Sequence, residues 1–331
     1  MFGFALFGAG RIGQIHARNL AARQDARLRH VVDVSPAAAR ALADTTGAAV
    51  SDAATALADA NVQAILIASS TDTHAALIAA GARAGKAIFC EKPLDLDLAR
   101  AEASIAAAAE ANVLLALGFN RRFDPAFRRL QREIAAGRVG KVEVVSITSR
   151  DPAPPPPAYV ARSGGLFRDM MIHDLDMARW LLGATPGSVY ARGGALIDPA
   201  IGAAGDIDTA VVVLEGAGGE LCQITNSRRC AYGYDQRIEV FGSGGLLRAD
   251  NVPATTVETA DAGGFTREPA LPFFLERYAA AYRDELDEFL RALRGEPAAL
   301  ATGEDGRQAL RLANAAQRSL ETRAPVALSD E

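Results

Sequence analysis

Two short segments carry the side chains that the oxidation of an alcohol requires. The first is residues 91–93, with the sequence EKP, and the second is residues 164–182, which contain Asp169 and His173. If the second segment forms one helix, the i, i+4 spacing of Asp169 and His173 places both on one face. Imidazole titrates close to working pH, so His173 suits the base that takes the hydroxyl proton as hydride leaves carbon. The ammonium of Lys92 can donate to the same oxygen and stabilise its developing alkoxide.

Other interpretations of this pattern stay open. An Asp–His pair on a helix face is frequently a capping or salt-bridge feature rather than a catalytic one. Asp169, His173 and Asp176 could also ligate a metal, but no second histidine or cysteine stands near them, so we expect no metal site.

A glycine motif near the start of the chain predicts a dinucleotide site. Gly8, Gly10 and Gly13 spell G-x-G-x-x-G between an apolar run and a helical stretch. The first glycine permits a tight turn, the second lets backbone approach a pyrophosphate, and the third lets the helix pack on the strand. We expect the first helical turn, with Arg11 and Ile12, to present free N–H groups to the phosphates.

Asp33 indicates which dinucleotide is bound. It lies 20 residues past Gly13 at the end of the second predicted strand, where a carboxylate accepts hydrogen bonds from the ribose hydroxyls. A carboxylate there repels a 2′-phosphate, and residues 34–36 supply no arginine to bind one. We therefore expect NAD, although Asp33 could also be a simple turn residue.

Further polar side chains follow later strands of the same predicted sheet. Ser69, Thr71 and His74 come after one strand, and Glu91 ends the next. Because the carboxyl ends of parallel strands line the ligand crevice, we expect these four residues near the cofactor. For His74, the alternative is the first turn of a solvated helix.

The elements that must position these residues change type along the chain. Up to about residue 120, apolar runs alternate with helical stretches, which predicts a doubly wound parallel sheet of the Rossmann type. After residue 120 several strands follow one another without helices between them, which predicts a mixed or antiparallel sheet. We therefore expect an α/β protein with an NAD-binding domain at 1–120 and a substrate-binding and oligomerisation domain at 121–331.

Three local patterns refine the second domain. Residues 167–182 are predicted to form one helix, and the proline cluster at 152–157 is predicted to be an extended loop. In residues 275–293, large apolar side chains recur at helical spacing, which predicts a helix packed on a core.

Composition excludes several classes of function. The 331 residues carry a net charge of -5 and no basic stripe, so nucleic-acid binding is not expected. No apolar run reaches the ~18 residues that span a bilayer, so no membrane association is expected. The three cysteines form no C-x-x-C pair, which favours free thiols and a cytoplasmic protein.

The motifs taken together resemble those of a known family. Over essentially the whole chain, the sequence is similar to the Gfo/Idh/MocA oxidoreductases, and especially to their inositol dehydrogenase branch. The motifs that carry the resemblance are GAGRIGxxHARNL, the VVD strand end, STDTH, EKP, GFNRRFDP and SGGLFRDMMIHDLDMARWLL.

The resemblance implies a Rossmann domain followed by an α/β domain whose large open sheet forms the interface of a dimer or tetramer. It implies a triad in which Lys92 orients the substrate hydroxyl, Asp169 positions substrate and base, and His173 is the base. It also implies a cis bond before Pro93, and polyol contacts from Arg122 and Tyr234, with Tyr232 as a further candidate.

The resemblance further implies a function. The expected reaction is oxidation of a secondary ring hydroxyl of a cyclic polyol by NAD, with myo-inositol as the first substrate. The alternatives are another polyol or sugar, such as scyllo-inositol or an aldose, and a non-catalytic NAD-dependent sugar sensor.

Overall fold

The computed structural model describes residues 1–330, which divide into two compact units. The first unit consists of Met1–Asn120 and Tyr282–Arg307, and the second of Arg121–Ala281 and the residues from Gln308 on. Within the described residues, no helix is both long enough and apolar enough to cross a bilayer.

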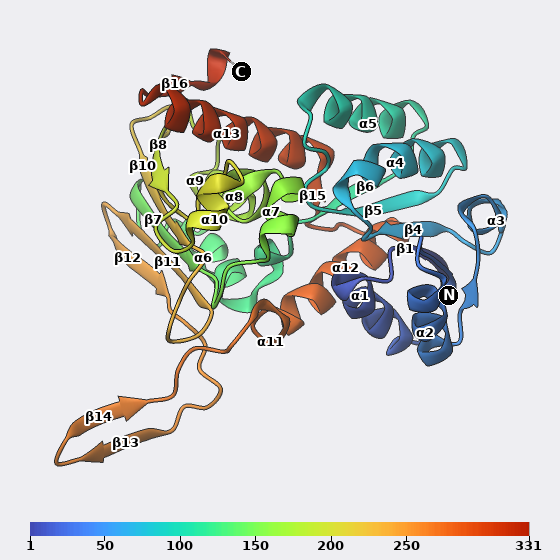
Figure 1. The fold of residues 1–331 in the computed structure, drawn as a ribbon, viewed down its shortest axis with the longest axis horizontal. Helices are drawn as coiled ribbons and strands as arrows, with labels where there is room; N and C mark the ends of the chain where they lie inside the picture. Colours follow the sequence, from blue (N-terminus) through green and yellow to red (C-terminus); the bar gives the residue numbers. More distant parts are fainter. Residues whose placement is uncertain (331) are drawn as a thin grey trace. The chain divides into compact units, whose positions relative to one another are not determined.

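The first unit is built on a seven-stranded sheet with the order β15-β6-β5-β4-β1-β2-β3 (Figure 1). All neighbouring strands are parallel except β15, which pairs antiparallel with β6. The central strands are buried because helices cover both faces of the sheet. The strands are β1 (Phe2–Phe7), β2 (Ala26–Val32), β3 (Ala49–Val50), β4 (Ala64–Ile67), β5 (Ala87–Glu91), β6 (Leu115–Gly118) and β15 (Ala301–Thr302).

Polar residues begin several helices of this unit. Ser35 and Asp97 accept hydrogen bonds from the backbone amides of Ala38 and Arg100 and so cap α2 and α5. The helices are α1 (Arg11–Ala21), α2 (Pro36–Thr46), α3 (Ala53–Ala58), α4 (His74–Arg83) and α5 (Leu98–Glu110), with a 3-10 turn η1 at Thr71–Thr73. The predicted Rossmann-type sheet is therefore confirmed.

The chain returns to the first unit near its C-terminal end, which the sequence analysis did not anticipate. We expected every residue after 120 to belong to the second domain, but Tyr282–Arg307 lie in the first unit. The reason is the apolar face of α12 (Ala279–Leu293), whose Phe289 ring packs edge-on against Phe89 and tilted against Phe4. Burying this face completes the core beneath α1 and α2.

The second unit contains a mixed seven-stranded sheet with the order β12-β11-β7-β10-β9-β8-β16. Only the β7–β10 pair is parallel. Buried and exposed residues alternate along β9, so one face of the sheet packs on helices and the other is open. The strands are β7 (Val142–Arg150), β8 (Ser188–Gly194), β9 (Thr209–Glu215), β10 (Leu221–Ser227), β11 (Asp235–Gly242), β12 (Gly245–Ala249) and β16 (Val326–Ala327).

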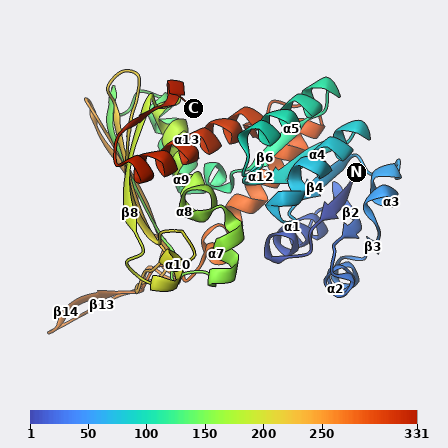
Figure 2. The ribbon, with the colours of Figure 1, turned by 45° about the horizontal axis from the view of Figure 1, so that its top comes forward.

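Helices cover one face of this second sheet (Figure 2). The proline cluster forms a loop up to residue 156, with a bend at residues 152–153 rather than the uniformly extended chain that was predicted. The following proline opens α7, a position that needs no backbone N–H. The helices are α6 (Pro125–Ala135), α7 (Pro157–Ser163), α8 (Gly165–Asp169), α9 (Ile172–Leu182), α10 (Pro199–Ala203), α11 (Phe274–Arg277) and α13 (Gly303–Thr322), with 3-10 turns η2 (Asn120–Phe123) and η3 (Leu328–Asp330).

A hairpin that the sequence analysis did not predict extends from the second unit (Figures 1 and 2). It is formed by β13 (Glu258–Asp261) and β14 (Gly264–Arg267), and every residue of both strands is exposed. Because no face is buried, the segment lacks the apolar alternation by which strands are predicted.

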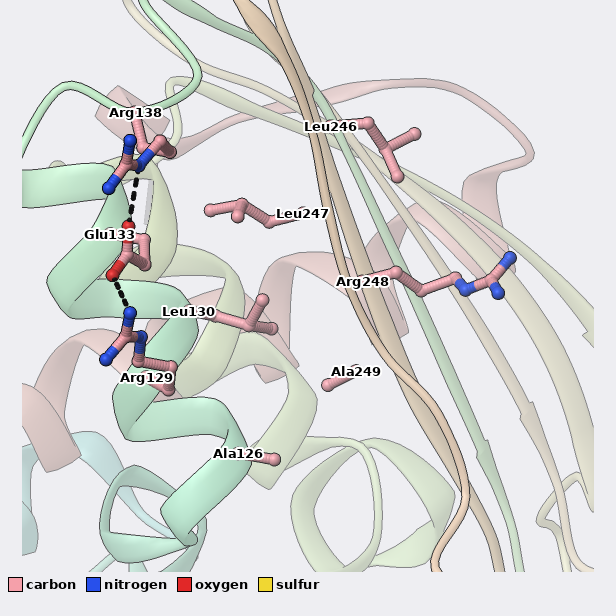
Figure 3. A pocket seen from close by; sticks show the side chains of 9 residues that line it. All are labelled: Ala126, Arg129, Leu130, Glu133, Arg138, Leu246, Leu247, Arg248 and Ala249. Atoms are coloured by element: carbon pink, nitrogen blue, oxygen red, sulfur yellow. Dashed lines mark hydrogen bonds and ion pairs between the residues drawn. The ribbon is translucent and has the colours of Figure 1, made fainter.

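A hollow of about 540 Å³ lies between α6 and β12 in the second unit (Figure 3). Leu130 and Leu247 point into it from opposite sides, while Leu246 and Arg248 point away on the other face of the sheet. Among the described residues that line it, none is a predicted site residue. The candidate site therefore has to be built from other parts of each unit.

Candidate active site

The loop between β1 and α1 has the turn, the open backbone and the close packing that were predicted for its three glycines. Gly8 has a φ of 103°, and a Cβ there would lie 2.5 Å from the carbonyl oxygen of Ala68. A Cβ on Gly13 would lie 1.9 Å from the carbonyl oxygen of Gly8, so helix and strand approach closely. A Cβ on Gly10 would meet no described atom within 4 Å. The backbone at Gly10 is thus open to a ligand.

The N-terminus of α1 suits a pyrophosphate. Gly10 is its N-cap, and no described side chain caps the first turn, which contains Arg11 and Ile12. The strand order reverses between β1 and β4, and ligands of open α/β sheets bind at such a switch point. An uncapped helix start at this point presents N–H groups and a positive dipole end.

Asp33 lies beside the glycine loop, as the ribose-binding role requires. Its Oδ2 accepts a hydrogen bond from the backbone amide of Ala9 at 2.6 Å, and its Oδ1 accepts one from that of Ser35 at 2.7 Å. These two bonds fix the carboxylate at the end of β2. Together with the open backbone at Gly10, they show that the residues present fit a dinucleotide.

The predicted residues Ser69, Thr71 and His74 follow β4, and two of them form hydrogen bonds within this segment or with the loop after β5. Ser69 and Thr73 share a hydrogen bond of 2.6 Å between their hydroxyls, and Thr71 opens the 3-10 turn η1. His74 is buried, with Nδ1 2.9 Å from the carbonyl oxygen of Pro93 and Nε2 3.2 Å from that of Ser69. Burial lowers the pKa of His74. Its ring therefore links the loops after β4 and β5, and its burial rules out the alternative of a solvated first turn, while its place near the cofactor stays a prediction.

Residues 91–93 follow at the carboxyl end of β5. The Lys92–Pro93 peptide bond is cis, as the family resemblance implies. Glu91 is buried, and its Oε1 lies 2.7 Å from Nε2 of His16. Lys92 is half-buried. The first unit thus places Lys92 on the same edge of the sheet as the glycine loop.

In the second unit, Asp169 and His173 belong to two helices rather than one. α8 ends at Asp169 and α9 begins at Ile172. The amide of Met171 donates to the carbonyl of Leu166, five residues back, which widens the turn and interrupts the helix. The prediction of a single regular helix over 167–182 was therefore wrong, and the i, i+4 argument does not apply here. Irregular turns of this kind are frequent at functional sites.

The carboxylate of Asp169 is held by two partners. Its Oδ1 accepts a hydrogen bond from the hydroxyl of Tyr159 at 2.9 Å, and its Oδ2 lies 3.3 Å from the buried guanidinium of Arg228. Both Asp169 and His173 are half-buried, which leaves part of each side chain accessible to a small molecule.

A buried polar network anchors the start of α9. Asp174, directly after His173, accepts hydrogen bonds from Arg121 at 2.5 Å, Ser149 at 2.6 Å and Asn226 at 2.9 Å. Ser149 belongs to β7 and Asn226 to β10, so the network fixes α9 to the sheet. These hydrogen bonds to Asp174 restrain the start of the helix that carries His173.

The predicted polyol contacts also lie in the second unit. Arg122 forms a forked pair with Asp176 at 2.8 and 2.5 Å, and its guanidinium lies 5.9 Å from the ring centre of Trp180. Tyr234 is buried, packs edge-on against Tyr278, and has a pKa raised well above its usual value by burial. Contacts of either residue with a polyol stay predictions.

Tyr232, the further candidate, differs from Tyr234. It is 47% exposed, and its hydroxyl donates to Asp235 at 2.7 Å and accepts from Arg150 at 2.6 Å. Burial and the hydrogen bond to Asp235 raise its pKa. These partners give Tyr232 a structural role in the turn before β11 in addition to the predicted one.

Sequence reasoning missed three ionisable residues near the predicted ones. His16 contacts Glu91 in the first unit, while Arg228 and Asp151 interact with Asp169 in the second. The histidine was visible in the motif after the glycine loop, one turn past Gly13. Arg228 and Asp151 follow strands of the second sheet, and nothing in their local sequence marks them.

Asp151 predicts a pH dependence of stability. Burial raises its pKa to about 6, helped by the charge of Asp169 and opposed by Arg228. Because this pKa is above its unfolded value of about 3.9, the folded state binds the extra proton and the free energy of unfolding falls as pH rises from about 4 to 6. We expect Asp151→Asn to lack this decline in urea unfolding measured across that range. Parallel pH curves for the two proteins would contradict the assignment.

Comparison with known proteins gives matches to both units. The model of an oxidoreductase family with an NAD-binding Rossmann fold matches residues 2–119, and that of the GFO/IDH/MocA C-terminal domain matches residues 127–248. The chain is 49% identical to an inositol 2-dehydrogenase of Rhizobium meliloti over 98% of this chain and 99% of that protein. It is also 49% identical to a myo-inositol 2-dehydrogenase of Thermotoga maritima, over 98% of each chain.

One more distant relative has a solved structure with a cofactor and an inositol bound. The scyllo-inositol dehydrogenase of Lactobacillus casei, with bound NAD(H) and scyllo-inositol, superposes with a TM-score of 0.91 at 30% identity. The match covers 99% of each chain.

Proposed function

Because the chain belongs to the Gfo/Idh/MocA family of NAD-binding oxidoreductases, we propose that it oxidises a secondary ring hydroxyl of an inositol. Its first substrate is myo-inositol, and its product is the corresponding inosose. The observation that supports this proposal most is the identity of 49% to an inositol 2-dehydrogenase over nearly the whole of both proteins.

The first unit supplies the NAD site. The open backbone at Gly10 and the first turn of α1 would hold the pyrophosphate, and Asp33 would hold the adenosine ribose. When bound, the nicotinamide supplies the acceptor for the hydride that leaves the ring carbon. At the same edge of the sheet, Glu91 ends β5, and Ser69, Thr71 and His74 lie between the end of β4 and the start of α4.

The proposed chemistry at the hydroxyl needs three side chains. His173 removes the hydroxyl proton, Lys92 donates a hydrogen bond to the developing alkoxide, and Asp169 positions the substrate and the base. Asp169 suits a fixed role because Tyr159 and Arg228 restrain its carboxylate. The rigid start of α9 similarly suits the positioning of a base.

A panel of polyols tests the proposed function. We expect NADH formation with the highest kcat/KM for myo-inositol, compared with scyllo-inositol, other inositols and aldoses. A higher kcat/KM for scyllo-inositol or an aldose would replace myo-inositol as the substrate. Tight NAD binding without reduction by any polyol would contradict an enzyme and favour the sugar sensor.

Asp33 gives a prediction about the cofactor. We expect Asp33→Ala to raise KM for NAD by about tenfold, since a hydrogen bond to a charged group contributes about 1.5–3 kcal/mol. KM for NADP should change less, because the variant loses the repulsion of a 2′-phosphate. Steady-state kinetics with both cofactors measure the ratio, and Ser35→Ala, at the neighbouring N-cap of α2, serves as the control. An unchanged ratio of the two KM values would refute the ribose role.

The open face of the second sheet supports a homo-oligomer. Leu221, Val144, Phe241 and Leu246 are paired in register across β10, β7, β11 and β12 and are 36–50% exposed. A contiguous row of exposed apolar side chains on one sheet face is typical of a protein interface. We propose that this face joins copies of the chain into a dimer or tetramer. Light scattering that gives a monomer for the wild type would contradict it.

A cytoplasmic location is part of the proposal. Cys90, Cys222 and Cys230 are all free thiols in the described structure. Buried free thiols fit a reducing compartment.

A further inference from the structure

A buried cluster of ionisable side chains in the first unit includes Glu91, the residue that precedes Lys92 in the chain. His16 on α1 and Glu91 on β5 are 1% and 8% exposed, and the atoms Nε2 and Oε1 that join them are 2.7 Å apart. This separation of Nε2 and Oε1 is that of a hydrogen bond. The pair connects the helix that starts at the glycine loop to the residue that precedes Lys92.

The ring of His16 is held in place by aromatic neighbours. It packs edge-on against Phe89, with ring centres 5.3 Å apart, and against Tyr282, with ring centres 5.7 Å apart. A packed ring of this kind keeps its nitrogen at one position. His16 therefore offers Glu91 a hydrogen-bond partner of fixed direction.

Two further residues confine the carboxylate of Glu91. On β6, a Cβ at Gly118 would lie 2.8 Å from the carboxyl carbon of Glu91, so the strand backbone supports the carboxylate closely. On α12, Glu285 is fully buried and neither of its oxygens has a hydrogen-bond partner among the described residues. Burial and the nearby Glu91 raise the pKa of Glu285 well above its usual value.

The residues immediately before and after Lys92 in the chain are consequently both held in place. The side chain of the preceding residue is fixed by His16, and the carbonyl of the following residue, Pro93, faces Nδ1 of His74 at 2.9 Å. Resting on the proposed function, we propose that His16 is a positioning residue for the reaction: through Glu91 it sets the direction of Lys92 relative to the glycine loop. Its effect is on the chemical step rather than on cofactor binding.

Substitutions separate this role from ordinary packing. His16→Leu removes the hydrogen-bond partner of Glu91, and Gly118→Ala displaces the flexible end of Glu91 without changing His16 itself. His16→Gln places an amide group, which can hydrogen-bond to Glu91, near the position of Nε2 and should rescue function. His30→Leu is the matched control, because His30 forms a similar pair with Asp59 at 3.0 Å in the same unit.

We expect His16→Leu and Gly118→Ala to lower kcat by about tenfold to a hundredfold, the size expected when a catalytic group is misplaced by about 1 Å. KM for NAD should stay near the wild-type value in both. His16→Gln should keep most of the wild-type kcat. His30→Leu should lower the melting temperature without lowering kcat.

A second measurement needs neither substrate nor NAD. The chain has only three lysines, so brief acetylation followed by mass spectrometry reports Lys86, Lys92 and Lys141 separately. We expect His16→Leu to increase the acetylation rate of Lys92, which loses one of its anchors, and to leave the exposed Lys141 unchanged. His30→Leu should leave the rate of Lys92 unchanged.

The two measurements distinguish failure of this inference from failure of the proposed function. If the wild type reduces NAD with no polyol, the proposed function is wrong, and the acetylation rates still test the position of Lys92. If His16→Leu matches His30→Leu in both kcat and Lys92 acetylation, His16 has only a packing role and the inference is overturned.

Discussion

Lys92→Met is expected to lower kcat for inositol oxidation by about 10²–10³-fold, the loss typical for removal of one donor to a developing oxyanion. Methionine keeps most of the length and packing of the lysine stem but has no ammonium to donate to the alkoxide. Because the glycine loop and Asp33 lie elsewhere on the sheet edge, NAD affinity should change little. Steady-state kinetics give kcat, and calorimetric titration gives the dissociation constant of NAD.

A second lysine provides the control for this prediction. Lys141 is exposed, with its Nζ 3.9 Å from Glu220 in the second unit, so Lys141→Met should keep the wild-type kcat. Near-normal turnover of Lys92→Met would remove the ammonium from the mechanism. Equal losses in the two variants would point to a general effect of charge instead.

His173→Ala should lower kcat by about 10²–10⁴-fold, the usual cost of losing a general base. In the wild type, kcat/KM should fall as pH drops through the range where imidazoles become protonated, and the variant should lack this limb of the profile. Because Asp151 has a pKa of about 6, we would record both profiles in an Asp151→Asn background. Rates of NADH formation at a series of pH values provide the measurement.

Added imidazole gives this prediction a specific control. Free imidazole should restore part of the activity of His173→Ala, because it can enter the space left by the side chain and accept the proton. It should not stimulate His30→Ala, whose ring lies on β2. If imidazole has no effect and the pH limb survives, His173 is not the base.

Local features of the fold could be predicted from the sequence because short-range physics determines them. The positive φ of Gly8 and the close approach of Gly13 to Gly8 involve only a few residues, and the structure has both. The alternation of strands and helices up to residue 120 likewise predicts the parallel sheet. The apolar spacing of 275–293 predicted helix there, but the structure divides it into α11, which ends at Arg277, and α12, which begins at Ala279.

Features that depend on distant contacts could not be predicted in the same way. The return of Tyr282–Arg307 to the first unit depends on Phe289 packing against Phe89, 200 positions away in the chain. The interruption between α8 and α9 is one hydrogen bond from Met171 to Leu166, and it leaves the apolar pattern unchanged. The partner of Glu91 is 75 positions earlier, so its motif alone does not reveal it.

The most direct test of the proposed chemistry is a crystal structure of the chain with NAD and myo-inositol bound. We expect Nζ of Lys92 and a ring nitrogen of His173 to lie within hydrogen-bond distance of the same inositol hydroxyl, on the carbon that faces the nicotinamide. An inositol whose reacting hydroxyl contacts only one of these groups, with the other directed into a separate region, would contradict the shared role of the two residues.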